Sequence, residues 1–291
     1  MTAPRDLRES AATRRSSIGR ARRGRGRCAT PVHICRYGLA AAWQDPVVPK
    51  VPYYKAELAR IHHEGFGFHA DAVAPGILKL LDPVREREGL VLEIGCGSGL
   101  LTKRLVDAGH RVLATDASAA MLDLARDYVP GAEAVQQLRL PDDPVPSADA
   151  IVAVGHPLSY LDDAEQLDRS LTAIARALRS GGLLAFDICD YQWGEARRDQ
   201  PPQVWFGEDW VLITVTSVPD RATFRREMTM FVRTAGELWR RADELHDNIL
   251  VDTNQLLTTL ARTGVSAEVR DSFGDETLPP GLAAVVGHRV A

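Results

Sequence analysis

The chain has 291 residues, of which 45% are hydrophobic and 25% are charged, which is the composition of a globular protein with one large domain or two small ones. It contains no run of about 18 apolar residues and no apolar, small-residue secretory pattern, so the sequence predicts neither a membrane span nor a signal peptide. The net charge of −4 divides into +8 for residues 1–50 and −12 for the remainder, and an acidic body argues against nucleic acid as its main partner.

Residues 1–50 are rich in Arg and Ser and show neither helical nor strand periodicity. Such a segment cannot bury enough apolar surface to offset the entropy of ordering it. We therefore predict a disordered basic extension before a domain over residues 51–291, or a start codon assigned too far upstream. A nucleic-acid-binding arm and an organelle-targeting peptide are the alternatives.

From residue 51 the pattern alternates between helices and short apolar strands, which is typical of a parallel sheet covered by helices. The clearest helix spans residues 162–178, where Leu167, Leu171 and Ile174 recur at helical spacing. Ser118 is a favourable N-cap for another. In chain order we predict helices over 54–63 and 70–81, a strand over 90–94, a helix over 100–108, a strand over 111–115, a helix over 118–128, and strands over 134–138, 148–154 and 183–188.

The pattern changes after the fifth strand. Residues 203–248 lack helical stripes and contain three strand-like runs, over 210–218, 223–232 and 238–247, separated by turn residues. We predict a small antiparallel insertion here. A helix capped by Asp252 or Thr253 follows, and the last two strands, over 266–270 and 283–290, are joined by a loop too short for a crossover helix, so they should be antiparallel.

The strongest motif is the glycine-rich turn at residues 95–99, which follows a strand and opens a helix. Glycines allow the backbone to approach a ligand closely, and open parallel sheets bind ligands at the carboxyl ends of their strands. Asp116 ends the next strand, where its carboxylate can accept hydrogen bonds from the ribose hydroxyls of an adenosine cofactor. Together the turn and the acid predict a nucleoside ligand.

The register of the glycines distinguishes between cofactors. A dinucleotide-binding turn has the form G-x-G-x-x-G, whereas the glycines here stand at 95, 97 and 99 and residue 100 is Leu. Glu93 also lies on the strand before the turn, where it would repel a pyrophosphate and attract a cationic amino acid moiety. Both features favour S-adenosylmethionine over NAD.

The chain resembles the class I S-adenosylmethionine-dependent methyltransferases over about residues 52–291. The resemblance rests on three segments at the right mutual spacing, which are Val91–Gly99 (VLEIGCGSG), Ala114–Met121 (ATDASAAM) and Leu178–Leu184 (LRSGGLL). It implies an α/β fold with a Rossmann-like, seven-stranded, mostly parallel sheet whose last hairpin is antiparallel, and a methyl transfer that uses S-adenosylmethionine as the cofactor.

The resemblance also implies the cofactor-binding residues. They are Glu93, Gly95, Cys96 and Gly97 for the methionine end, Asp116 for the ribose, and Ala117, Met121, Gln137 and Leu138 for the adenine. Many relatives carry an acid or amide where this chain has Leu138, so the adenine contact departs from the usual pattern.

The segment after the fourth strand faces the reacting centre in this family. It contains His156, our candidate general base, and Tyr160, a second candidate. His156 could equally cap the strand end or contact the cofactor carboxylate. The helices over 54–63 and 70–81, with His62, His63 and Phe66–Phe68, are expected to form a lid together with the antiparallel insertion. Simple helix packing with exposed histidines is the alternative. Met228, Met230 and Phe231 could line an acceptor pocket or belong to the core.

The motifs that this chain lacks narrow the acceptor. It has no Asn/Asp-Pro-Pro-Tyr motif, no Pro-Cys nucleophile pair and no pair of glutamates arranged for an arginine substrate, which points to a small-molecule acceptor. A NAD-type oxidoreductase, a non-catalytic S-adenosylmethionine-binding protein and an RNA methyltransferase with a basic tail are the alternatives. The four cysteines, Cys28, Cys35, Cys96 and Cys189, form no disulfide or zinc pattern, so we predict no metal and a cytoplasmic location.

Overall fold

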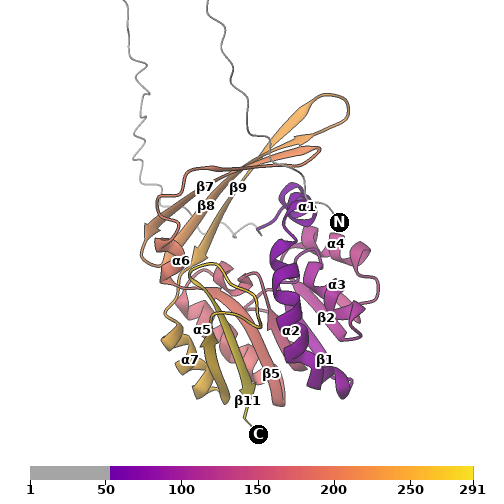
Figure 1. The fold of residues 1–291 in the computed structure, drawn as a ribbon, viewed down its shortest axis with the longest axis vertical. Coiled ribbons are helices and arrows are strands. Elements are labelled where there is room, and N and C mark those ends of the chain that lie inside the picture. The colour runs from indigo at the N-terminus through magenta and orange to yellow at the C-terminus, as the bar shows by residue number, and fades with distance from the viewer. Residues whose placement is uncertain (1–52, 291) are drawn as a thin grey trace, which may run out of the picture. The chain divides into compact units, whose positions relative to one another are not determined.

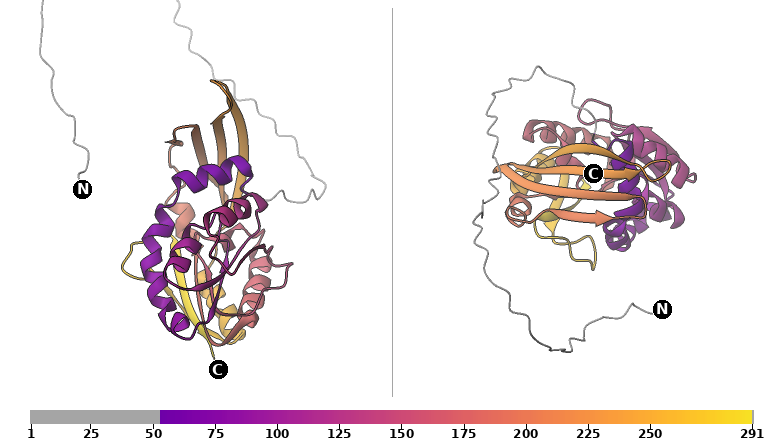
Figure 2. Two further views of the ribbon diagram at one scale, coloured as in Figure 1. Left: turned by 90° about the vertical axis from the view of Figure 1, so that its right-hand side faces the viewer. Right: turned by 90° about the horizontal axis from the view of Figure 1, so that it is seen from above.

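The computed structural model describes residues 53–290, and the extension predicted over residues 1–50 lies outside these described residues. Residues 53–290 form two β-sheets, the larger of which is covered by helices (Figures 1 and 2). No helix in this part of the chain is both long and apolar enough to cross a membrane.

The larger sheet has seven strands in the order β10-β11-β5-β4-β1-β2-β3 within the described residues. Strands β1 to β5 pair in parallel, and β11 lies antiparallel to both β5 and β10. The predicted Rossmann-like sheet and its antiparallel last hairpin are thus confirmed. The strands are β1 (Leu90–Ile94), β2 (Arg111–Asp116), β3 (Ala134–Gln137), β4 (Ala148–Ala153), β5 (Leu178–Cys189), β10 (Val265–Arg270) and β11 (Leu282–Arg289).

Helices cover both faces of this sheet because successive strand residues point to opposite faces. Val91 packs with residues of α2 and α3, whereas its neighbour Leu92 packs with residues of α5 and α7. The helices are α1 (Ala56–Gly65), α2 (Phe68–Glu86), α3 (Leu100–Asp107), α4 (Ala119–Tyr128), α5 (Ala164–Ala177), α6 (Tyr191–Glu195) and α7 (Thr253–Arg262).

The helix boundaries differ from the predicted ones in places. Ser118 and Asp252 cap α4 and α7 as expected, whereas Asp163 caps α5. Helix α2 continues past the predicted end through Pro83, and the burial of Val84 against the sheet helps to offset the hydrogen bond that this proline cannot donate. The short helix α6 and a 3-10 turn, η1 (Pro157–Tyr160), were not predicted.

The insertion after β5 forms a separate antiparallel sheet in the order β6-β7-β8-β9 (Figure 2). The predicted strands are confirmed, each slightly longer than expected, and β6 adds a fourth. Leu58 and Ile61 of α1 pack against Trp210, Leu212 and Met230 of this sheet. The first helix and the insertion therefore share a small core of their own. The strands are β6 (Gln203–Phe206), β7 (Trp210–Asp220), β8 (Thr223–Arg233) and β9 (Trp239–Ile249).

Candidate active site

The glycine-rich turn and Asp116 lie side by side at the carboxyl ends of β1 and β2. The two strands pair in parallel, with Ile94 opposite Thr115. One oxygen of the Asp116 carboxylate accepts a hydrogen bond from the Gly97 backbone N–H at 2.9 Å, and the other accepts one from the Ser118 N–H at 2.8 Å. β1 pairs with β4 on its other side, so the turn lies where the strand order reverses, as the sequence predicted.

Two glycines of the turn are required by its geometry. Gly95 has a φ of +72°, and a Cβ at this position would lie 2.3 Å from the Cβ of Pro157. Gly97 has a φ of +54°, also in the left-handed region that favours glycine. The turn can therefore bring its backbone close to a ligand, and η1 packs directly against it.

Glu93 gives the turn a buried acid. Its side chain is 3% exposed, and its Oε2 has no hydrogen-bond partner among the described residues. Burial, together with the charge of Asp116, raises the pKa of Glu93 to about 7. A buried carboxyl group in this state gains from a positively charged ligand, so the site fits the cationic amino acid end of S-adenosylmethionine.

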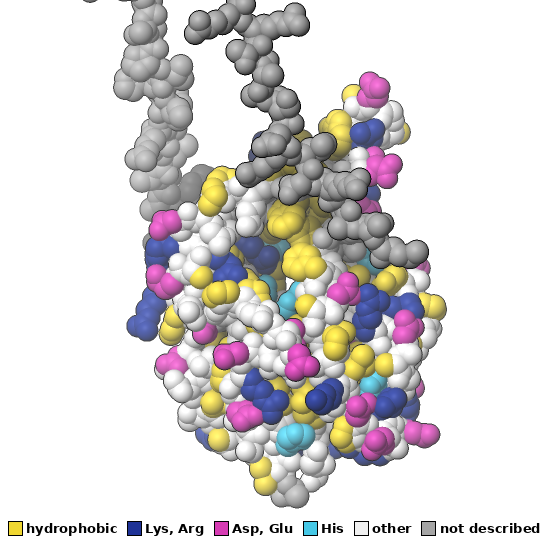
Figure 3. All heavy atoms as spheres, in the orientation of Figure 1, with side chains coloured by type: hydrophobic (Ala, Val, Ile, Leu, Met, Phe, Trp, Pro, Cys, Tyr) yellow, Lys and Arg dark blue, Asp and Glu magenta, His cyan; other side chains and the backbone are white. Residues whose placement is uncertain are grey.

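A cavity of about 740 Å³ opens beside these residues. Figure 3 shows a hollow below the insertion in which Arg or Lys and His side chains gather. Gln137 is the one predicted cofactor residue absent from the wall, because it is exposed and donates to the Ala117 carbonyl oxygen. The predicted residues that line the cavity are Glu93, Gly95, Cys96, Gly97, Asp116, Ala117, Met121, Leu138 and His156.

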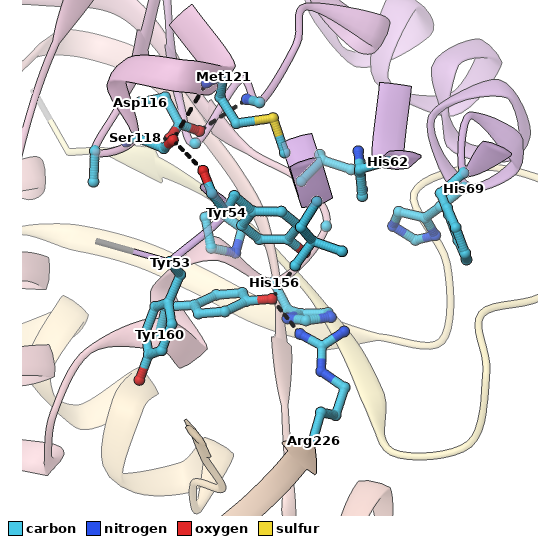
Figure 4. Close-up of a pocket in the computed structure, with 18 of the residues that line it drawn as sticks. Tyr53, Tyr54, His62, His69, Asp116, Ser118, Met121, His156, Tyr160 and Arg226 are labelled. Carbon is cyan, nitrogen blue, oxygen red and sulfur yellow. Dashed lines mark hydrogen bonds between the residues drawn. The ribbon is translucent and has the colours of Figure 1, made fainter. Parts of the chain in front are cut away.

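His156 and Tyr160 lie at the end of the cavity away from Asp116 (Figure 4). Burial and the nearby charge of Arg226 lower the pKa of His156 to about 3, so its imidazole stays neutral at physiological pH. Burial raises the pKa of Tyr160 well above 10, so its phenol stays protonated. Neither group favours taking up a proton or losing one in this environment.

A second histidine, which the sequence did not single out, also lines the cavity. The Nε2 of His69 lies 2.8 Å from an oxygen of Asp187, a fully buried residue at the end of β5. The backbone N–H groups of Gly155 and His156 donate to the same carboxylate. Burial alone would lower the pKa of His69, but the hydrogen bond and charge of Asp187, with the charge of Glu276, raise it.

Tyr54 crosses the cavity between its two ends (Figure 4). Its carbonyl oxygen accepts a hydrogen bond from the Ser118 hydroxyl at 2.7 Å, and its phenol oxygen lies 3.0 Å from that of Tyr160. The backbone N–H groups of Tyr54 and Lys55 donate to the buried carboxylate of Glu244 on β9. The segment before α1 is thus held between the main sheet and the insertion.

The elements predicted to form a lid contribute several side chains to the wall of the cavity. His62, Phe66 and Phe68 line the cavity. Of the methionines on β8, Met228 lines it, whereas Met230 is fully buried in the core shared with α1. The residues that the structure describes contain no group of three His, Cys, Asp or Glu side chains arranged to hold a metal ion.

Comparison with known proteins points to the same family of enzymes as the geometry of the site. Residues 91–182 match a family described as a methyltransferase domain. Over 250 residues, 82% of this chain, the protein is 26% identical to a relative from Geobacillus sp. (strain WCH70) that is named as a methyltransferase, and the match covers 93% of that relative.

Two solved structures have a similar fold. An S-adenosylmethionine-dependent methyltransferase from Clostridium acetobutylicum has a TM-score of 0.68 at 17% identity, over 81% of this chain and 98% of that one. The sugar N-methyltransferase KedS8 from Streptoalloteichus has a TM-score of 0.68 at 22% identity, over 85% of this chain and 100% of that one. Together with the turn and the strand order, these matches show a methyltransferase domain over residues 91–182, within a chain that has the fold of the S-adenosylmethionine-dependent methyltransferases.

Proposed function

We propose that the protein transfers the methyl group of S-adenosylmethionine to a small molecule that binds in the same cavity. One observation carries this proposal. A single cavity extends from Asp116, at the end of β2, to Arg226, on β8 of the insertion. A space of about 740 Å³ that is walled on several sides suits a cofactor and a small acceptor better than a polymer.

The residues at the β1 and β2 end would hold the cofactor. Glu93 and the backbone of the turn fit the methionine end, Asp116 fits the ribose, and Met121 and Leu138 supply apolar walls for the adenine. The cofactor brings an already activated methyl group, so the protein mainly has to align the acceptor and exclude water. The inserted sheet and Tyr54 cover the cavity and supply that exclusion.

An acceptor that loses a proton needs a base nearby. His156 remains our sequence-based candidate, but its lowered pKa makes it a weak proton acceptor. His69 lines the same cavity, and Asp187 stabilises its protonated form. We therefore propose His69 as the stronger candidate, with Asp187 as the residue that orients it.

The acceptor can be sought directly. We would incubate metabolite extracts with isotope-labelled S-adenosylmethionine and the protein, and detect labelled products by mass, with Asp116→Ala as the control. A labelled small molecule that requires the intact site supports the proposal. Binding of the cofactor without any labelled product would instead indicate a non-catalytic binding protein. Labelled RNA from an RNA-containing extract, lost on deletion of residues 1–50, would indicate an RNA methyltransferase.

Cofactor affinity is expected to rise with pH between about 6 and 8. Because the pKa of Glu93 is about 7, the carboxyl group is partly protonated at neutral pH and must ionise to pair with a cation. Binding should therefore release protons, which calorimetry in buffers of different ionisation enthalpy detects. Glu93→Gln should remove most of this proton release, and an unchanged release in that variant would exclude Glu93 as its source.

The pH dependence of turnover should separate the two histidines. At saturating cofactor, the rate should rise with pH as His69 loses its proton, with an inflection above 6.5, since its pKa is raised. His69→Gln should lower kcat by about 10²- to 10⁴-fold and abolish the inflection. An inflection that survives in His69→Gln but disappears in His156→Gln would assign the base to His156.

A further inference from the structure

Arg226 places a guanidinium group on the wall of the cavity at the end away from Asp116 (Figure 4). It comes from the middle of β8, opposite Thr216 of β7 and His246 of β9. Its Nη2 donates to the Tyr160 hydroxyl and, at 3.3 Å, to the Asn248 side-chain oxygen. Both partners are neutral groups.

Within residues 53–290 the charge of Arg226 has no partner of opposite sign. No carboxylate of the described residues lies within 4.0 Å of this guanidinium, and its Nε is buried without a hydrogen-bond partner among them. The preceding residue, Arg225, points to the other side of the sheet and forms a two-point ion pair with Asp247, at 2.7 Å and 2.8 Å. A cation removed from water without such a partner is costly, which suggests that a ligand supplies the anion.

A second guanidinium strengthens the positive charge at this end. Arg197 lines the cavity and stacks over the Trp193 ring at 3.3 Å, and its Nη1 donates to two backbone carbonyl oxygens, those of Trp193 and Pro280. No carboxylate among the described residues is within ion-pair distance of it either. Burial and the charge of Arg226 lower the pKa of Arg197, which indicates that the two charges act on each other.

The other groups around Arg226 do not neutralise it. Burial and its charge lower the pKa of His62 to about 4 and that of His156 to about 3, so both rings are neutral. Of the acids that line the cavity, Glu93 and Asp116 belong to the cofactor end, and neither Asp142 nor Asp162 forms an ion pair with Arg226. The end of the cavity away from Asp116 therefore carries two guanidinium groups, those of Arg226 and Arg197.

We propose that the methyl acceptor is a small organic acid whose carboxylate or phosphate group pairs with Arg226 and Arg197. The inference rests on the proposed function, because it assigns the acceptor to this same cavity. A planar guanidinium recognises such groups with two parallel hydrogen bonds. The walls next to the two arginines are apolar, with Trp193, Phe224 and Met228, so the rest of the acceptor is expected to be apolar or aromatic.

Binding of simple probes tests this proposal without turnover. We would load the protein with S-adenosylhomocysteine and titrate it by calorimetry with benzoate, phenyl phosphate and the neutral isostere benzamide. Wild type should bind at least one of the two anions about tenfold or more tightly than benzamide, and the better anion identifies the acid group. Arg226→Gln should remove this preference, with a change of less than about threefold in affinity for S-adenosylhomocysteine.

A neighbouring arginine supplies the matched control. Arg225→Gln removes a positive charge from the same strand, but on the face of the sheet opposite to Arg226. This variant should therefore still bind the anion more tightly than benzamide. If Arg226→Gln does not fold, as judged by circular dichroism, Arg226→Lys retains the charge and should keep a weaker preference, while Arg197→Gln should reduce it.

Three results would overturn the proposal. The first is that benzamide binds wild type as tightly as both anions. The second is that the folded Arg226→Gln variant keeps the preference for the anion. The third is that this variant loses affinity for S-adenosylhomocysteine as much as for the anion, which would assign Arg226 to the cofactor carboxylate. None of these depends on methyl transfer. Failure of the labelling screen would therefore count against the proposed function, and failure of the probe titration only against the acidic acceptor.

Discussion

Replacing Asp116 by alanine is expected to weaken the binding of S-adenosylmethionine by about 1–3 kcal/mol, or roughly 5- to 150-fold. The carboxylate accepts hydrogen bonds from the backbone N–H groups of Gly97 and Ser118, so it holds the turn against the start of α4. Its removal leaves both donors without their partner and deletes the proposed acceptor for the ribose hydroxyls. Calorimetric titration of the folded variant measures the effect.

A control variant on α4 distinguishes the loss of the site carboxylate from the loss of any negative charge nearby. Asp123→Ala removes an exposed acid of α4 that pairs with Arg126 on the surface. Its effect on cofactor affinity should be within about twofold, because exposed ion pairs contribute little. Unaltered cofactor binding in Asp116→Ala would contradict the ribose assignment.

Gly95→Ala is expected to cost about 2–5 kcal/mol of folding stability and to abolish cofactor binding at ordinary concentrations. Two effects add. The residue has a φ of +72°, which strains any side chain, and the new Cβ would lie 2.3 Å from the Cβ of Pro157. Relief of this overlap requires the turn to move away from η1, which displaces the backbone that faces the ligand. Chemical denaturation and cofactor titration measure the two losses.

Gly109→Ala provides the matched comparison. Gly109 has a φ of +87°, but a Cβ there meets nothing within 4 Å, so only the backbone strain of about 1–2 kcal/mol is expected. The difference between the two variants reports the contact with Pro157. Pro157→Gly removes the Cβ of residue 157, so Gly95→Ala and Pro157→Gly together should cost less stability than the sum of the two single losses, and additive losses would show that the overlap is not the cause.

The sequence was sufficient for the fold class and for the proximity of the glycine-rich turn to Asp116. The turn at residues 95–99 and Asp116 end consecutive strands, and consecutive parallel strands at a switch point are neighbours, so their proximity follows from local pattern alone. The family resemblance predicted His156 near the reacting centre, and His156 lines the cavity because it follows β4, the strand that pairs with β1 on its other side. Gln137 shows the limit of this logic, since it ends its strand as expected but faces away from the cavity.

Only the tertiary structure decided which residues form the end of the cavity away from Asp116. Arg225 and Arg226 are adjacent and chemically alike, and strand alternation requires that they face opposite sides without saying which one faces the cavity. The register of β8 between β7 and β9 makes that choice. His69 meets Asp187 across 118 positions of the chain, and Tyr54 meets Glu244 across 190. Local periodicity reports which face of an element is apolar, but contacts at such separations depend on how whole elements pack, and that packing is determined by the complete fold.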